Sequence, residues 1–385
     1  MAQLVEQRIR NAWVRGSSPR VGSSTNKSQI LAMSVCVFLI SFAMTKKTRN
    51  ILLSVSALVV LLVGFAAWAV RAVVRPAFEL DETAYVYVRP STTEADVLRQ
   101  LQDEAHARSL VGWHLLRSVA DFHPRTGRYA VHPDDNILTV LRRLRNGQQT
   151  PVRLTLPSVR RLSRLAGTLA GRLMLDSAEV ADAFADERYA AQYGYTVATL
   201  PALFIPNTYE IFWNTTLEAF MQRMQRENAS FWAAEGRDAA AKALGMSHEE
   251  VATLASIVDE ETADNAEKPR VAGVYLNRLQ RHIPLQADPT VKFATGDDSL
   301  RRILAQHLRT LSPYNTYLNL GLPPGPIRIP SIAAIDAVLK AEKHDYIYFC
   351  AKEDFSGTHN FATNYPEHMA NARRYQRALN ARGIR

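Results

Sequence analysis

The stretch that decides the fold is Met246–Thr262, MSHEEVATLASIVDEET, which ends in three adjacent acids followed by a threonine. Ser247 and Glu250 have the spacing of a capping box, in which each side chain bonds to the other residue's backbone N–H at the start of a helix. We therefore expect a helix that begins near residue 247 and carries the three acids in its last turn.

One of these acids falls on the apolar side of the helix. At about 100° per residue, the apolar stripe consists of Leu254, Ile257 and Val258. Glu261 lies inside this stripe, whereas Asp259 points nearly the opposite way and Glu260 lies on the flank. Apolar surroundings disfavour a charged carboxyl group, so we expect the pKa of Glu261 to exceed its usual value of about 4.3, as a general acid requires. The alternative is a helix end that has simply reached solvent.

Composition bounds the class of protein. The chain has 385 residues, 47% of them hydrophobic, which suffices for two or three domains with ordinary cores. Its net charge is +9, but residues 1–50 carry eight basic side chains and one acidic side chain, so +7 of this charge lies there. The rest is nearly neutral, which argues against a nucleic-acid-binding protein. Cys36 and Cys350 provide neither a disulfide framework nor a cysteine-based metal site, and we expect no metal or cofactor.

A membrane anchor is predicted near the N-terminus. Ile51–Val70, ILLSVSALVVLLVGFAAWAV, has no charged side chain over about 20 residues, the length that crosses a bilayer. We expect a transmembrane helix over residues 51–74, with the basic residues 1–50 in the cytoplasm and the remainder outside. A cleaved signal peptide is the alternative, although its apolar run is usually only about 7 to 15 residues long.

A second apolar stretch, Ile30–Met44, is about 15 residues long and therefore a poor membrane span. We hypothesise that translation begins at Met44, which leaves one compact basic flank before the helix. Residues 1–43 would then come from an over-extended gene model. Peptides from residues 1–43 in mass spectrometry of the native protein would contradict this hypothesis.

Residues 77–156 are expected to form a small α+β module outside the membrane. The piece Gly127–Leu156 has the strand, helix, strand order of a degenerate LysM-like unit, and LysM units bind chains that contain N-acetylglucosamine. The alternative is a structural spacer without sugar contacts, because no residue in this piece requires a ligand.

Polar and rigid motifs follow the capped helix. In order they are NRL at 277–279, LQADPTV at 285–291, YNTY at 314–317, GLPPGPI at 321–327 and TNY at 363–365. We expect a loop at LQADPTV, because Pro289 makes a regular element there unlikely to form. Tyr346–Ala351 and Thr358–Phe361 are expected to pair as a hairpin, with Gly357 at its turn.

With ASIVDEET at 255–262 these make six ordered motifs, which resemble the MltG (YceG-like) family of endolytic murein transglycosylases over about residues 80–380. The family's ASIxExET pattern places its catalytic glutamate at Glu261, and Asp259 stands where the family usually has glutamate. The resemblance implies a single-pass protein of the bacterial inner membrane with a cytoplasmic N-terminus and a LysM-like subdomain. It also implies a mixed α/β catalytic domain, residues 157–385, with a lysozyme-like active-site arrangement.

The resemblance further implies cleavage of nascent glycan strands between N-acetylmuramic acid and N-acetylglucosamine, leaving a 1,6-anhydro end, beside the cell-wall synthesis machinery. Further motif positions implied to line the cleft or hold its loops are Glu267, Asn277, Gln286, Asp288, Tyr314, Asn315, His359 and Asn364. One alternative is a glycan hydrolase (muramidase), with Asp288 or Glu267 as a second carboxylate. The other is a non-catalytic peptidoglycan-binding factor.

Overall fold

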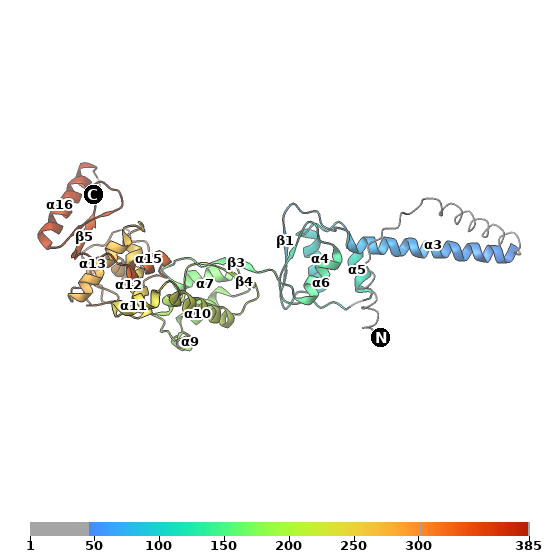
Figure 1. The fold of residues 1–385 in the computed structure, drawn as a ribbon, viewed down its shortest axis with the longest axis horizontal. Helices are drawn as coiled ribbons and strands as arrows, with labels where there is room; N and C mark the ends of the chain where they lie inside the picture. The colour runs from blue at the N-terminus through green and yellow to red at the C-terminus, as the bar shows by residue number, and fades with distance from the viewer. Residues whose placement is uncertain (1–45, 120, 301, 384–385) are drawn as a thin grey trace, which may run out of the picture. The chain divides into compact units, whose positions relative to one another are not determined.

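The structure combines helices with short strands, as the sequence predicts (Figure 1). The residues that the computed structural model describes are 46–119, 121–300 and 302–383. Within them, the strands form three separate two-stranded antiparallel sheets. The chain divides into two compact units, of which the first comprises the described residues up to Arg75 together with Val111–Val119. The second unit comprises Pro76–Leu110 and the rest of the chain.

The first unit consists mainly of α3 (Lys46–Val74) and α5 (Val111–Arg117), which contact each other. A Cβ atom on Gly112 would lie 2.4 Å from the backbone oxygen of Ala72, so the close approach of these helices requires glycine. Within the described part of the chain, α3 alone is long and apolar enough to cross a bilayer, although a signal sequence also meets this criterion. The predicted features that lie outside the described residues are Ile30–Met44, Cys36 and the start at Met44.

The N-terminal part of the second unit contains residues 77–156 except α5 and its neighbours, which belong to the first unit. Its elements are β1 (Ala84–Val88), α4 (Glu94–Asp103), β2 (Gly127–Val131), α6 (Ile137–Asn146) and β3 (Val152–Thr155). Strand, helix and strand follow one another over residues 127–156 as expected, but β2 and β3 do not pair with each other. Instead β2 pairs with β1, and β3 pairs with β4 (Thr208–Ile211). The predicted LysM-like piece therefore contributes its strands to two sheets.

One hydrophobic core of the second unit surrounds the β3–β4 sheet. The elements of this region are α7 (Leu162–Ala170), α8 (Ser177–Ala185), α9 (Glu187–Gln192), η1 (Leu200–Leu203) and α10 (Leu217–Ala233). Leu154 of β3, Phe204 and Phe220 are fully buried in this core. Burying one such side chain stabilises the folded state by about 1.5–3 kcal/mol, so these contacts hold the sheet against its helices.

A second core surrounds α12 (His248–Glu261). The other elements of this region are α11 (Arg237–Leu244), α13 (Lys268–Gln280), α14 (Asp288–Thr295), η2 (His307–Arg309), α15 (Ile332–Leu339), β5 (Tyr348–Ala351), β6 (His359–Ala362) and α16 (Tyr365–Ala381). The capping box that the sequence predicts is present, since Ser247 and Glu250 bond reciprocally at the start of α12. Contacts join α12, α13 and α15 to one another (Figure 1).

Two expectations for this region need correction. Every residue of α12 from Val251 to Val258 is buried, so the helix has no solvent-facing side along this stretch and a single apolar stripe does not describe it. The expected loop at LQADPTV is wrong from Asp288 onward, because Pro289 lies in the first turn of α14. Proline fits there since the first N–H groups of a helix have no intrahelical partner. The hairpin β5–β6 forms as predicted, with Gly357 at φ +80°.

Candidate active site

The three acids at the end of α12 have different surroundings. Asp259 lies in a buried ion pair in which Lys268 Nζ is 2.7 Å from Asp259 Oδ1 and both side chains are 6% exposed. The backbone N–H and the hydroxyl of Ser331 also donate to this carboxylate, each at 2.9 Å. Burial acts to raise the pKa of Asp259, but the hydrogen bonds from Lys268 and Ser331 outweigh it and hold the pKa below its usual value. Asp259 therefore joins α12, α13 and the start of α15.

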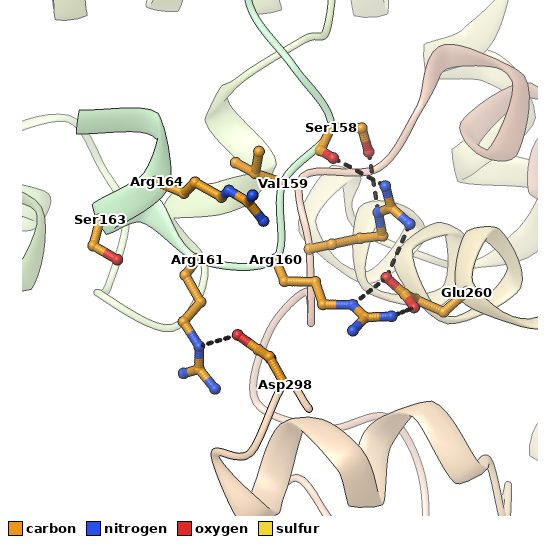
Figure 2. A pocket seen from close by; sticks show the side chains of 9 residues that line it. Ser158, Val159, Arg160, Arg161, Ser163, Arg164, Glu260 and Asp298 are labelled. Carbon is orange, nitrogen blue, oxygen red and sulfur yellow. Dashed lines mark hydrogen bonds and ion pairs between the residues drawn. The ribbon is translucent and has the colours of Figure 1, made fainter. Parts of the chain in front are cut away.

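Glu260 is held by two arginines, as Figure 2 shows. Arg160 donates to both carboxylate oxygens, with 2.8 Å between its Nε and Oε1. Arg328 Nη1 donates to Oε1 at 2.9 Å, and its Nη2 donates to the backbone oxygen of Ser158. The Glu260 side chain is only 7% exposed. Glu260 thus joins the C-terminal end of α12 to segments that lie far away in the sequence.

Glu261 has different neighbours from the other two acids. Tyr275 donates its hydroxyl hydrogen to Oε1 at 2.6 Å, and no basic side chain among the described residues forms an ion pair with this carboxyl group. Burial raises the pKa of Glu261 from 4.5 to about 7, against the Tyr275 hydrogen bond, which lowers it. The negative charges of Asp288 and Glu260 contribute to this raised value, and the charge of Arg278 opposes them. The sequence prediction of a raised pKa agrees with this environment.

Glu261 opens into a hollow of about 330 Å³, which we call the Glu261 hollow. Its lining residues are Glu261, Tyr275, Arg278, Leu285, Gln286, Asp288, Tyr317, Tyr348, Phe349, Tyr365 and His368. Two of the predicted positions, Gln286 and Asp288, therefore share this hollow with Glu261. Asp288 Oδ1 accepts a hydrogen bond of 2.7 Å from Tyr317.

Arg278 lines the Glu261 hollow and donates hydrogen bonds to backbone oxygens around it. Its Nε donates to Ile347 O at 2.6 Å and its Nη1 donates to Leu285 O at 2.9 Å. Burial lowers the pKa of Arg278. The same Nη1 reaches Gln286 Oε1, and Gln286 has φ +50°, a left-handed conformation that costs a non-glycine residue of order 1 kcal/mol. Arg278 thus joins the hairpin to the loop that carries Gln286.

Glu267 and His359 form a pair outside the lining of the Glu261 hollow. His359 Nδ1 is 2.8 Å from Glu267 Oε2, and the backbone N–H of His359 donates to Oε1 at 2.7 Å. This pair joins the N-cap of α13 to β6. Asn277 also acts on the backbone, because its Nδ2 donates to the carbonyl oxygens of His344 and Tyr346.

The remaining predicted positions support loops and a helix end. Tyr314 packs against Phe293, with 4.7 Å between ring centroids. The Asn315 side chain donates to the carbonyl oxygens of Leu308 and Thr310. Asn364 caps α16 by accepting from the backbone N–H of Glu367. None of these three side chains lines the Glu261 hollow.

Several lining residues were not predicted from the sequence. They are Tyr275, Arg278, Leu285, Tyr317, Tyr348, Phe349, Tyr365 and His368. Tyr275 and Arg278 are three residues apart on α13, a spacing that places them on one face and could have indicated a shared role. Tyr317 and Tyr365 end the YNTY and TNY motifs. No sequence signal distinguishes Tyr348, Phe349 or His368.

Comparisons with known proteins point to one family. The model of the YceG-like family matches residues 86–374. This chain is 36% identical over 162 residues to an endolytic murein transglycosylase from Bacillus subtilis (strain 168), an alignment that covers 42% of this chain and 44% of that relative. It is 30% identical over 281 residues to an endolytic murein transglycosylase from Streptococcus pneumoniae (strain R6), which covers 64% of this chain and 50% of that relative. The chain therefore spans about half the length of the curated relatives it matches.

A crystal structure of a YceG-like protein from Listeria monocytogenes is similar to this fold, with a TM-score of 0.50 and 26% sequence identity. The match covers 75% of this chain and 99% of that protein. Because the family model spans most of the sequence and includes every residue of the Glu261 hollow, the predicted resemblance is confirmed. The chain belongs to the YceG-like family.

Proposed function

We propose that this chain is a membrane-anchored endolytic lytic transglycosylase of peptidoglycan, with Glu261 as its catalytic residue. The observation that carries the proposal is a carboxyl group with a pKa of about 7 that opens into a hollow lined by polar and aromatic side chains. A pKa near the working pH suits a group that must first give a proton and then take one back. Family membership and the names of the relatives support murein as the substrate.

The proposed reaction uses the Glu261 carboxyl group twice. The protonated acid donates to the glycosidic oxygen between N-acetylmuramic acid and N-acetylglucosamine as the bond from C1 to that oxygen breaks. The resulting carboxylate takes the proton from the C6 hydroxyl group of the same muramic acid. That oxygen attacks C1 and closes the 1,6-anhydro ring, a step favoured because both groups belong to one sugar. Glu261 ends protonated, and no water is consumed.

Neighbouring residues tune the two states of Glu261. The Tyr275 hydroxyl donates to the carboxyl group and therefore favours the carboxylate that exists between the two proton transfers. The Asp288 charge favours the protonated acid at the start of the cycle. Tyr317, Tyr348 and Tyr365 supply aromatic faces and hydroxyl groups that suit a sugar substrate. We assign to Gln286 and Asp288 the contact with the glycan.

A peptidoglycan hydrolase is the runner-up, because Asp288 shares the hollow with Glu261 and could serve as the second carboxylate. Glu267, the other candidate for this role, is engaged by His359 and does not line the hollow. A non-catalytic peptidoglycan-binding factor does not need a buried carboxyl group with a raised pKa. At neutral pH such a group destabilises the folded state.

We further propose how the chain is arranged at the membrane. Residues 1–50 lie in the cytoplasm, 51–74 cross the bacterial inner membrane, 77–156 form a LysM-like glycan-binding subdomain, and 157–385 form a catalytic domain with a lysozyme-like arrangement beside the wall-synthesis machinery. The length and apolar composition of α3 support the anchor. The order β2, α6, β3 supports the LysM-like subdomain. Protease added to spheroplasts should remove everything after the anchor, and protection of the catalytic domain would reverse this topology.

The reaction is tested by digestion of uncross-linked murein strands with the full chain, followed by mass spectrometry of the ends. The wild type should produce 1,6-anhydromuramic acid ends, and Glu261→Gln should lower the rate by about 10²–10⁴-fold. Reducing ends that disappear in Asp288→Asn would establish the hydrolase. Full activity in Glu261→Gln would overturn the catalytic assignment, and no cleavage by any variant would favour the binding factor.

A further inference from the structure

A second hollow, of about 620 Å³, lies on the Glu260 side of α12 (Figure 2). We call it the arginine hollow, because its charged lining residues are Arg160, Arg161, Arg164, Arg328, Glu260 and Asp298. Four cations therefore face two anions, which gives the lining a net charge of +2. The volume lies within the range of about 300–1,000 Å³ that is typical of small-ligand sites.

The two acids of the arginine hollow are already fully engaged. Glu260 accepts from Arg160 and Arg328, and Asp298 Oδ2 is 3.0 Å from Arg161 Nε. Arg161 Nη2 also donates to the backbone oxygen of Gly296 at 3.1 Å, so Arg161 is held at two of its nitrogen atoms.

Arg164 is the cation that no acid neutralises. Among the described residues, its guanidinium group has neither an ion pair nor a hydrogen bond. Figure 2 shows this group turned toward the segment of Val159 and Arg160, with no dashed line to it. Its five N–H donors are arranged in a fork that matches a carboxylate.

We propose that the arginine hollow binds a carboxylate of the short peptides carried by murein strands, with Arg164 as its ligand. This inference rests on the proposed function. Glycan hydroxyl groups are uncharged, whereas the peptide carboxylates are ionised at neutral pH. A guanidinium fork forms two parallel charge-assisted hydrogen bonds with such a group, which selects carboxylates over neutral ligands. The Glu261 hollow does not offer this, because its acids Glu261 and Asp288 repel anions and its Arg278 is committed to backbone oxygens.

The proposal is tested by calorimetric titration of the full chain carrying Glu261→Gln, so that bound strands are not cleaved. The glycan ligands are peptide-free glycan whose muramic acid carboxyl groups are amidated, glycan with its peptides, and the same glycan with the peptide carboxylates amidated. Inorganic pyrophosphate is titrated separately. The native peptides should increase affinity about tenfold over peptide-free glycan, the effect of one charge-assisted hydrogen-bonded pair. Amidation should abolish this preference, and so should Arg164→Ala added to the Glu261→Gln chain.

Arg226→Ala is the matched control, because Arg226 is likewise exposed and lies on α10, outside the hollow. It should keep the tenfold preference. Arg164 is exposed, so its substitution should leave the thermal unfolding curve unchanged, which separates lost binding from lost folding.

Equal affinity for the three glycan ligands, or a preference that survives Arg164→Ala, would overturn the proposal. A preference for inorganic pyrophosphate with none for peptides would replace the carboxylate by a phosphate ligand. This titration does not measure cleavage, so a failure of the proposed reaction is detected only in the digestion experiment.

Discussion

The two hollows at the end of α12 differ although each is built around a glutamate and the two glutamates are adjacent. Glu260 faces Arg160 and Arg328, which hold it as a charged clamp between segments. Glu261 faces the hydroxyl of Tyr275 and the charge of Asp288, and its burial raises its pKa to about 7, so that about half of it is protonated at that pH. The helix supplies the same side chain twice. The surrounding segments therefore decide which carboxylate is structural and which is suited to proton transfer.

Asp259 belongs with Glu260 in this comparison, and the largest effect is expected from breaking its buried pair. Lys268→Met leaves the Asp259 charge without its cation, which should lower the free energy of unfolding by about 3–5 kcal/mol. Urea denaturation at pH 7 measures this change. The control is Lys242→Met, which breaks an exposed pair with Asp238 and should cost less than about 1 kcal/mol. Equal losses in the two variants would mean that burial does not distinguish these pairs.

The next effect concerns Glu261, where a neutral substitution should stabilise the fold. Its pKa is about 7 when folded and 4.5 as a free side chain, so the stability that it contributes is complete below pH 4.5 and is lost as the pH rises through 7. Glu261→Gln should therefore raise the free energy of unfolding by about 1–3 kcal/mol at pH 8 and leave it unchanged at pH 4.

Glu260→Gln should have the opposite effect on the free energy of unfolding, because it removes an anion from between two arginines and should destabilise the fold at pH 8. Urea denaturation of both variants at pH 4 and pH 8 measures the four free energies of unfolding. Destabilisation by Glu261→Gln at pH 8 would show that its carboxylate is held as firmly as that of Glu260.

The contrast between the two glutamates could be predicted only in part. The capping box at Ser247 specified the helix locally, and the apolar period gave the direction of Glu261. However, every residue of α12 from Val251 to Val258 is buried, so the period alone does not explain why Glu260 pairs with arginines. That depends on Arg160 and Arg328, which are 100 and 68 residues away in the sequence and therefore form no local pattern.

The candidate site shows the same limit. Gln286, Asp288 and His359 were all predicted as motif positions, but only Gln286 and Asp288 line the Glu261 hollow, whereas His359 pairs with Glu267. The sequence does not reveal which acidic side chain a histidine contacts in the folded protein. Pro289 misled the prediction of a loop because a proline that breaks the middle of a helix is well suited to its first turn.

A smaller effect is expected from Tyr275, which distinguishes the Glu261 hollow by supplying a neutral donor. Its hydrogen bond favours the carboxylate, so Tyr275→Phe should raise the pKa of Glu261 and shift the alkaline limb of the pH–rate profile upward by about one unit. Tyr365→Phe is the control, because Tyr365 lines the same hollow without bonding to Glu261. A shift of the same size in both variants would assign the effect to the hollow as a whole.

The smallest effect is expected from Asp288, whose charge raises the pKa of Glu261 from a distance. Asp288→Asn removes this charge and keeps an acceptor for Tyr317, so the alkaline limb should move downward by about half a unit or less. Because Asp288 is exposed, added salt should screen its charge and shrink the difference from the wild type. Rates measured from pH 5 to 9 at low and high salt give the shift. If Asp288 instead supplies the second carboxylate of a hydrolase, the wild type forms reducing ends and Asp288→Asn abolishes them at every pH, so the profile and the chain ends together separate electrostatic tuning from a second catalytic carboxylate.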